Sequence, residues 1–442
     1  MTGPGKPGDL LAFVTTDYAG ITRGRALPVA DWQPGMRKSL GWVPANMSLT
    51  PFDEIASPNP WGSSGDLRLL PDETARYRVD LPGSATTLDM MMADIVELDG
   101  TPWLACPRQM LKTALADLET ETGLQVNASF EHEFQVLDAQ WPAAPAFSLQ
   151  ALRRADPFGP DVIAALTAAG LQPEAFIAEY GRDQFEVPVA PAIGIKAADH
   201  AVALREIVRE LARNRGWRAS FAPKTAVQGV GNGVHLHMSF LDAAGQPAMH
   251  DPGRPGGLSA IGGSFAAGIL RHLPALVAIT APSPISCLRL QPHQWSSAWT
   301  WLGERDREAT LRICPVQTIT GSDPARGYNL EYRAADATAC PHLVLAVILR
   351  AGLEGIRAGL PAPPIFAGDP EAVSEAARAD LGIHRLPGTL DAALMALVAD
   401  PVACGWFHPK ALETYLRMKR KEMQIAGPAL DQALCARYAG IY

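Results

Sequence analysis

The chain has 442 residues, of which 48% are hydrophobic and 19% are charged. This composition is typical of a globular enzyme and excludes disordered and fibrous classes, while the length favours one large domain together with a smaller one. The 38 basic and 46 acidic residues give a formal net charge of −8, which argues against nucleic acid or an anionic membrane surface as the main partner.

The six cysteines are scattered without a CxxC pair. This pattern predicts reduced thiols rather than a disulfide framework or a structural zinc site. The first residues, MTGPGKPGD, lack the apolar core of a signal peptide, and we expect no clean apolar stretch of about 18 residues. We therefore predict a cytoplasmic protein without a membrane segment.

The first hundred residues predict a small β-rich unit, because short apolar runs alternate with Gly and Pro turn signals. Residues 53–65 show no periodicity and predict a long loop. Apolar residues at helical spacing then predict helices over 108–123, 198–215 and 258–279. The last hundred residues are predicted to be mainly helical.

Four stretches between these helices alternate polar and apolar side chains: SFEHEFQV, GRDQFEVP, GVHLHMSF and YNLEYRAA. Because strand side chains alternate between faces, each stretch predicts a strand with one apolar face. For any single stretch, a sheet with one solvated face is the more common explanation. A solvated face normally carries lysine, however, and crowded carboxylates repel one another unless cations neutralise them. The polar positions, none of them lysine, are Glu131, Glu133, Gln184, Glu186, His235, His237, Ser239, Asn329, Glu331 and Arg333.

The order of these stretches resembles the glutamine synthetase superfamily from about residue 9 to about residue 424. The motifs that carry the resemblance are Glu131-His132-Glu133, Glu179 with Gln184 and Glu186, Pro223-Lys224, Gly233 to Ser239, Arg289, Asp306 to Arg312, and Glu331-Tyr332-Arg333. The resemblance implies an α+β fold with a small N-terminal β-grasp-like domain (residues 1–105) and a catalytic domain (residues 106–442). In the catalytic domain, a curved antiparallel sheet backed by helices would form a half-barrel active site.

The resemblance also implies a role for each motif residue. One divalent ion would bind Glu133, Glu179 and Glu186, and a second would bind Glu131, His235 and Glu331. Oxygen-rich ligands with one imidazole fit Mg²⁺ or Mn²⁺ better than zinc. The nucleotide side of the ATP site would hold His237, Ser239 and Arg312, and Arg307 and Arg312 would face the transferred phosphoryl group. Arg289 and Arg333 would bind the carboxylates of the acceptor substrate, near Gly231 in the substrate loop.

Four departures from the family pattern affect the predicted substrate. Trp295 stands where ammonia-using members carry a flap glutamate, and an indole suits an organic amine better than ammonium; a packing role in the flap is the alternative. The substrate-loop asparagine has moved to Asn232, and Asn329 replaces an arginine for which Arg326 is a candidate substitute. Asp53 is a loose match to an acid supplied across a subunit interface; an Asx turn explains it equally well.

The function that the resemblance implies is an ATP-dependent ligase that forms a γ-glutamyl amide from glutamate and an organic amine through an acyl phosphate. The alternative within the family is a glutamine synthetase that uses ammonia. A catalytically silent regulator is disfavoured because all six metal positions are filled, and a phosphagen-type kinase is the other outside alternative. We expect a homo-oligomer, a dodecamer of two hexameric rings, as the family resemblance implies.

Overall fold

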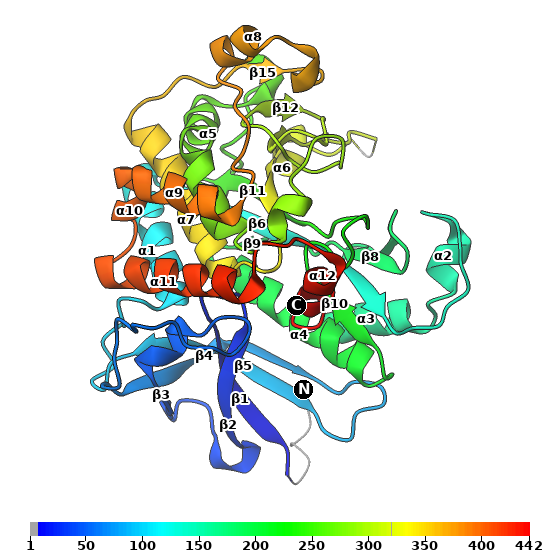
Figure 1. Cartoon of the computed structure of the whole chain (residues 1–442), viewed down its shortest axis with the longest axis vertical. Coiled ribbons are helices and arrows are strands. Elements are labelled where there is room, and N and C mark those ends of the chain that lie inside the picture. Colours follow the sequence, from blue (N-terminus) through cyan, green and yellow to red (C-terminus); the bar gives the residue numbers. More distant parts are fainter. Residues whose placement is uncertain (1–7, 320) are drawn as a thin grey trace.

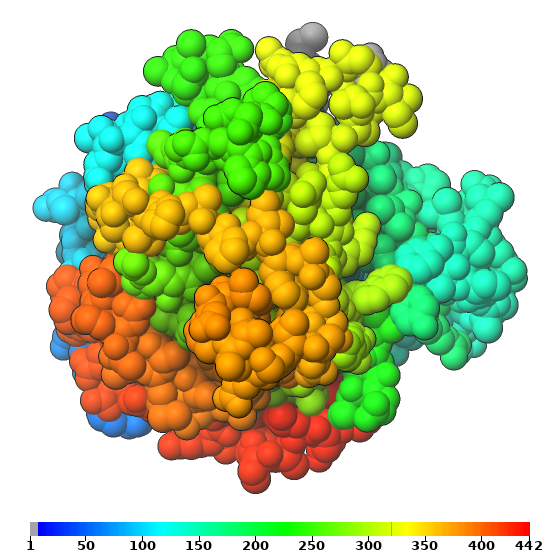
Figure 2. Space-filling model, turned by 90° about the horizontal axis from the view of Figure 1, so that it is seen from above, coloured from blue at the N-terminus to red at the C-terminus, as the bar shows by residue number. Residues whose placement is uncertain are grey.

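The structure is a computed structural model that describes residues 8–319 and 321–442. The expectation for the N-terminal segment 1–7 falls outside the described residues. Figure 1 shows the N-terminal sheet (blue) at one end and a larger unit of sheet and helices above it. Seen from above in Figure 2, the region around α2 (Leu149–Arg153) projects from one side, as it does in Figure 1.

The N-terminal sheet has five strands in the order β2-β1-β5-β4-β3. The β1–β5 pair is parallel and the other pairs are antiparallel. Besides its strands, the described part of the chain before residue 107 has two short 3-10 turns, η1 (Val29–Asp31) and η2 (Pro44–Ser48). It has no α-helix, so the β-grasp detail is not confirmed. The strands are β1 (Leu10–Thr16), β2 (Thr22–Pro28), β3 (Leu40–Trp42), β4 (Leu67–Val79) and β5 (Leu88–Val96).

Gly20, in the turn between β1 and β2, brings this sheet against the catalytic unit. Its φ is +74°, and a Cβ atom there would lie 2.5 Å from the carbonyl oxygen of Thr338. Glycine is therefore required both for the left-handed backbone and for the close approach. The turn cannot carry a larger residue without separating the two units.

The catalytic sheet has ten strands, and its main path runs β15-β12-β13-β14-β11-β6-β8-β7. The prediction of a wholly antiparallel sheet is wrong at one edge, where β12 pairs in parallel with β13 and β15. The four predicted strands are confirmed as β6, β8, β11 and β14, although Asn329 lies just before its strand. The strands are β6 (Gln125–Leu137), β7 (Ile177–Ala178), β8 (Gln184–Val187), β9 (Ala192–Ile193), β10 (Arg218–Ser220), β11 (Val234–Leu241), β12 (Leu302–Glu304), β13 (Leu311–Ile313), β14 (Leu330–Ala335) and β15 (Ile365–Phe366).

The alternation of β6 separates the hydrophobic core from the site. Phe130 and Phe134 are fully buried on the apolar face, where Phe134 contacts the ring of Phe158. Burying each phenylalanine contributes about 2–3 kcal/mol. The opposite face carries Glu131 and Glu133, so the packing of the core determines which way the two carboxylates point.

The predicted helices are confirmed as α1, α4 and α5. Their ends follow local chemistry, since α1 starts with Pro107 at its first turn and ends at Gly123, whose φ is +70°. The helices not yet given are α1 (Pro107–Thr122), α3 (Phe158–Ala168), α4 (Ile195–Arg213), α5 (Ala260–Thr280), α6 (Pro324–Gly327), α7 (Pro341–Arg357), α8 (Glu375–Asp380), α9 (Leu390–Ala399), α10 (Pro401–Gly405), α11 (Pro409–Ala426) and α12 (Gln432–Ala439), with 3-10 turns η3 (Pro255–Gly257), η4 (Ser286–Leu288) and η5 (Pro370–Ala372).

Helix α5 is apolar over a membrane-length stretch, but Arg271 and His272 interrupt that stretch. It has 21 residues and a mean hydropathy of 1.3 in its most apolar window, so it is long and apolar enough to cross a membrane by length and composition alone. Of that window, 61% is buried inside the molecule, and the helix packs against α7 and α9. We interpret α5 as a core helix of this fold.

Candidate active site

The strand register brings the predicted ligands together on one side of the catalytic sheet. Across the β6–β11 pair, Glu131 lies opposite His235, and across the β11–β14 pair, Glu331 lies opposite His237. Strand β8 adds Glu186 opposite Glu133, and β13 adds Arg312 opposite Glu331. Residues that are 200 positions apart in the chain therefore meet because directly opposite side chains on paired strands share a face.

Glu131, His235 and Glu331 form a group that fits a divalent cation. Their ligand atoms all lie within 4.8 Å of one another, and His235 Nδ1 lies 3.3 Å from Glu131 Oε2 and 3.6 Å from Glu331 Oε1. Burial alone would raise the pKa of Glu131, but hydrogen bonds from His235 and His237 hold it well below its usual value. These three residues are the set predicted for the second ion.

The other predicted set, Glu133, Glu179 and Glu186, lines the cavity beside this group. Burial, followed by repulsion from Glu131, Glu133 and Glu179, raises the pKa of Glu186 to about 10. Burial and the charge of Glu133 also raise the pKa of Glu179. Such crowding of acids is relieved when a cation neutralises them, so the donor chemistry fits a divalent ion held by oxygen ligands.

Two buried arginines flank Glu331. Arg312 Nη1 donates to Glu331 Oε2 at 2.8 Å, and Arg333 Nη1 donates to Glu331 Oε1. Burial would raise the pKa of Glu331, but the charges of Arg333, His235 and His237 and a hydrogen bond from Arg312 lower it to about 2. The Nε atoms of both arginines are buried and have no hydrogen-bond partner in the structure. Unpaired guanidinium donors of this kind fit carboxylate or phosphoryl oxygens.

The path of the Arg289 side chain depends on the absence of a side chain at Gly231. Arg289 is buried, lines the cavity, and donates from Nη1 to the Ala335 carbonyl at 2.8 Å. A Cβ atom on Gly231 would lie 2.9 Å from Arg289 Cγ. Glycine at 231 therefore leaves the space in which the arginine side chain runs to the cavity.

The shifted Asn232 has a structural role. It is fully buried, its Oδ1 accepts a 2.8 Å hydrogen bond from Gln184 Nε2, and its Nδ2 donates to the Ala222 carbonyl at 2.8 Å. Gln184 Nε2 also donates to the Gly231 carbonyl at 2.8 Å. Asn232 thus anchors the loop that presents Gly231 and does not line the cavity.

The remaining predicted residues lie at different distances from the cavity. Arg307 is exposed and lines it, whereas His237 contacts Glu131 at 3.2 Å and Asn329 at 2.9 Å beside the ligand group. Ser239 donates only a long 3.5 Å hydrogen bond to the Asn127 carbonyl. Asp53 does not line the cavity of its own chain; its side chain is 82% exposed and lies 3.4 Å from Arg23. Arg326, on α6, is exposed.

The cavity has a volume of about 920 Å³, and three exposed aromatic rings lie along its lining: Phe147, Tyr180 and Trp295. The Tyr180 ring centroid is 6.2 Å from that of Trp295 and 6.2 Å from that of Phe147. Sequence reasoning found Trp295 but missed Phe147 and Tyr180, because loop aromatics carry no periodic signal. Tyr180 follows the predicted ligand Glu179 directly, which was the one available clue.

Comparison with known families decides what this arrangement is. The family described as "Glutamine synthetase, catalytic domain" matches residues 104–433, and the "Glutamine synthetase N-terminal domain" matches residues 4–103. The chain belongs to the glutamine synthetase family. Members of this family use ATP and divalent metals, which agrees with the carboxylate-rich ligand sets and the unpaired arginine donors.

Several relatives of this glutamine synthetase family member cover nearly its whole length. Gamma-glutamylpolyamine synthetase GlnA3 of Streptomyces coelicolor is 36% identical over 100% of this chain and 95% of its own. A glutamine synthetase of Methanocaldococcus jannaschii is 30% identical over 93% of this chain and 91% of its own. A crystal structure of a "novel glutamine synthase homolog" is 48% identical over 100% of both chains with a TM-score of 0.91. A ligand-free structure of GmaS is 25% identical over 94% of this chain and 92% of its own, with a TM-score of 0.77.

Proposed function

We propose that this protein is an ATP-dependent ligase that joins the side-chain carboxylate of glutamate to an organic amine. The carboxylate is activated as an acyl phosphate, and the deprotonated amine then displaces phosphate. Support comes from family membership and from the full-length similarity to a gamma-glutamylpolyamine synthetase. The choice of an organic amine over ammonia rests on the cavity itself.

The observation that carries this choice is the aromatic row of Phe147, Tyr180 and Trp295 along the cavity. These residues are 54%, 62% and 63% exposed, which is unusual for aromatic residues of this size. An alkylammonium group gains about 1–2 kcal/mol from such faces through cation–π and apolar contact. Glu179 precedes Tyr180 in the chain and also lines the cavity, so a carboxylate lies close to the rings. This combination suits an amine that has both a charge and a hydrocarbon chain.

In this proposal, separate groups of residues bind the metal ions, the substrate carboxylates and the nucleotide. Glu133, Glu179 and Glu186 would hold one Mg²⁺ or Mn²⁺ ion, and Glu131, His235 and Glu331 a second; the ions supply charge neutralisation of the transferred phosphoryl group. Arg289 and Arg333 would orient the substrate carboxylates. His237, Ser239 and Arg312 would contact the nucleotide, while Arg307 and Arg312 would stabilise charge that develops during transfer.

We further propose that the enzyme is a cytoplasmic homo-oligomer, a dodecamer of two hexameric rings, and that a domain boundary lies between residues 105 and 106. Asp53 would then complete the amine site of a neighbouring chain. Its exposure in the single chain leaves the carboxylate accessible to such a neighbour. Trp295 would close the same site from the flap.

The test is phosphate release from ATP with glutamate and a panel of amines that includes ammonia, methylamine, ethanolamine and di- and polyamines. We expect an organic amine to exceed ammonia by tenfold to several hundredfold in kcat/KM. Mass spectrometry of the product separates a γ-glutamyl amide from glutamine. Faster synthesis of glutamine than of any organic amide would establish the alternative, a glutamine synthetase.

A further inference from the structure

We propose that Glu308 is a positioning residue that sets amine selectivity by holding the flap, residues 289–298, over the cavity. This inference rests on the proposed function and goes beyond it by assigning the residue that places Trp295. Glu308 Oε1 accepts a 2.5 Å hydrogen bond from the backbone N–H of Trp295. Glu308 Oε2 accepts a 3.2 Å hydrogen bond from the backbone N–H of His293. One carboxylate therefore binds both ends of a three-residue turn.

The flap backbone needs such a partner because it is strained. The φ angles of His293 and Trp295 are +59° and +49°. The left-handed region costs a residue with a side chain about 1–2 kcal/mol, so contacts that stabilise this backbone offset the cost. A turn in which left-handed residues alternate with others directs its backbone N–H groups toward one anion. In this turn the anion is the Glu308 carboxylate of the same chain.

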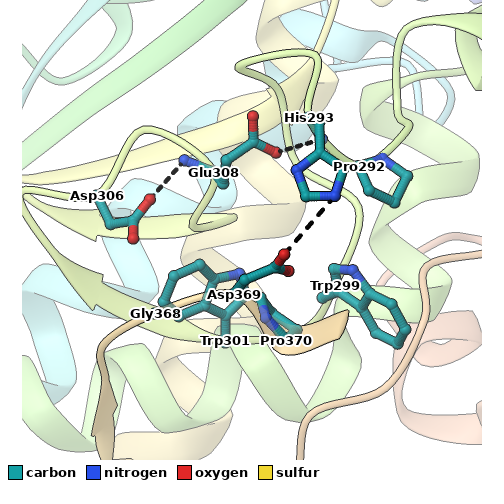
Figure 3. A pocket seen from close by; sticks show the side chains of 9 residues that line it. All are labelled: Pro292, His293, Trp299, Trp301, Asp306, Glu308, Gly368, Asp369 and Pro370. Atoms are coloured by element: carbon teal, nitrogen blue, oxygen red, sulfur yellow. Dashed lines mark hydrogen bonds and ion pairs between the residues drawn. The ribbon is translucent and has the colours of Figure 1, made fainter. Parts of the chain in front are cut away.

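The backbone of Glu308 is itself held by a hydrogen bond to Asp306. Its backbone N–H donates to Asp306 Oδ1 at 2.9 Å, and Figure 3 shows Asp306, Glu308 and the His293 backbone connected in this order. The next residue on one side is Arg307, which lines the cavity. Glu308 thus ties the flap to the segment that carries a predicted phosphoryl-binding arginine.

Trp295 is held at both of its backbone polar groups, while its indole remains free. Arg333 Nη2 donates to the Trp295 carbonyl at 3.0 Å, and Glu308 accepts from its N–H. Trp295 is 63% exposed, and its ring lies along the cavity beside Tyr180. Loss of either backbone anchor should therefore change where the indole lies without removing it. Its contact with an organic amine depends on that position, whereas ammonia has no hydrocarbon for the indole to touch.

The flap has a second attachment that Glu308 does not control. The His293 ring lies 3.3 Å from Glu371 and 3.7 Å from Asp369, across a small cavity of about 160 Å³ that also borders Glu308. Figure 3 shows the imidazole pointing across this cavity toward Asp369. Variants at Glu308 should therefore loosen the turn around Trp295 and leave the flap attached through the His293 ring.

The experiment compares two variants, Glu308→Gln and Glu308→Ser. Glutamine has the same shape as glutamate, but it lacks the charge and has only one side-chain oxygen to accept the N–H groups of His293 and Trp295. Glu304→Gln, an exposed glutamate on β12, is the matched control. We expect kcat/KM for the best organic amine to fall about tenfold in Glu308→Gln, mainly through KM, with less than about a twofold change for ammonia. Backbone hydrogen exchange of flap peptides should accelerate in both Glu308 variants and stay unchanged in the control.

A double-mutant cycle with Trp295→Ala tests whether Glu308 acts through the indole. If it does, Glu308→Gln adds little to the loss already caused by Trp295→Ala. Equal losses with ammonia and with the organic amine, additive losses in the cycle, or unchanged flap exchange would each overturn the positioning role. The exchange measurement needs no substrate, so it separates failure of this inference from failure of the proposed function, which would show as a wild-type preference for ammonia.

Discussion

Glu133 on β6 and Glu186 on β8 occupy paired positions of two antiparallel strands, and burial together with neighbouring carboxylates raises the pKa of Glu186 to about 10. The fold therefore forces acids together at a point where water alone cannot screen them. This arrangement costs free energy in the absence of a cation. A divalent cation bound there, as we propose, would offset this cost.

Glu133→Gln should abolish nearly all turnover while the protein stays folded, because it removes one anionic ligand from a set that has no nitrogen donor. We expect a fall of at least about a hundredfold in kcat/KM and a weaker response to Mg²⁺ or Mn²⁺. Activity titrated with each metal after chelator treatment measures this effect. Glu375→Gln, on the exposed helix α8, is the control. Full activity in the chelator-treated wild type would exclude a metal-dependent reaction.

Arg333→Lys should lower kcat/KM for glutamate by about a hundredfold or more. The guanidinium binds Glu331 and the Trp295 carbonyl and, in the proposed function, also a substrate carboxylate, and an ammonium group cannot make all three contacts at once. Steady-state kinetics with varied glutamate measures the loss. Arg213→Lys, at an exposed site in the last turn of α4, should behave as wild type. An unchanged KM for glutamate in Arg333→Lys would remove Arg333 from the substrate site.

Trp295→Glu should narrow the preference for the organic amine over ammonia. The carboxylate gives ammonium a charge partner, and the lost indole removes apolar contact, each effect worth about 1–2 kcal/mol. Competition between ammonia and the best amine, with both products quantified, reports the ratio directly. Trp295→Phe keeps an aromatic face and should retain most of the wild-type preference. A ratio that does not change in Trp295→Glu would show that the flap tryptophan only packs.

Asp53 yields a prediction about assembly. Asp53→Ala and Glu133→Gln should each be inactive alone, but refolding or coexpressing the two chains together should restore about a quarter of the sites, because each restored site takes Asp53 from one chain and Glu133 from another. Activity of mixed particles, with mass from light scattering, tests this. If Asp53 served its own chain, every site in the mixture would carry a defect and no activity would return.

Asp199 joins the N-terminal sheet to the helices through buried charges. It accepts hydrogen bonds from Arg108 at 2.8 Å and from His342 at 2.9 Å, and Arg108 also binds Asp72 on β4. Burial would raise the pKa of Asp199, but hydrogen bonds from His342 and Arg108 lower it to about 2, from an ordinary value of 3.8.

Because the folded-state pKa is depressed, the carboxylate stabilises the fold above pH 4, and this contribution is lost as the pH falls from about 4 to about 2. Asp199→Asn should therefore lower the free energy of unfolding by about 3 kcal/mol at neutral pH. The difference from wild type should shrink below pH 4. Denaturant midpoints measured from pH 7 down to pH 3 test this, and a pH-independent difference would contradict the charge argument.

The sequence by itself determined the local features of this protein. Alternating polar and apolar residues in SFEHEFQV and GVHLHMSF predicted two strands with a ligand-bearing face, and both strands are present. The reason is that the apolar face, which in the first strand carries Phe130 and Phe134, must be buried. Helices α1, α4 and α5 followed from apolar spacing in the same way. The candidate metal ligands Glu131, His235 and Glu331 were predicted from the order of motifs, and the strand register brings those three side chains together.

Only the tertiary structure decided the features that depend on side chains from loops far apart in the chain. The sequence showed only that the loop asparagine had moved to Asn232. The structure buries its side chain against Gln184, since loop direction is set by long-range hydrogen bonds. Phe147, Tyr180 and Trp295 come from three separate loops, and no local pattern records that they meet. The hydrogen bond from the Trp295 backbone N–H to Glu308 is likewise not predictable from any sequence pattern. Periodic burial is encoded locally, whereas the meeting of loops depends on the packing of the whole chain.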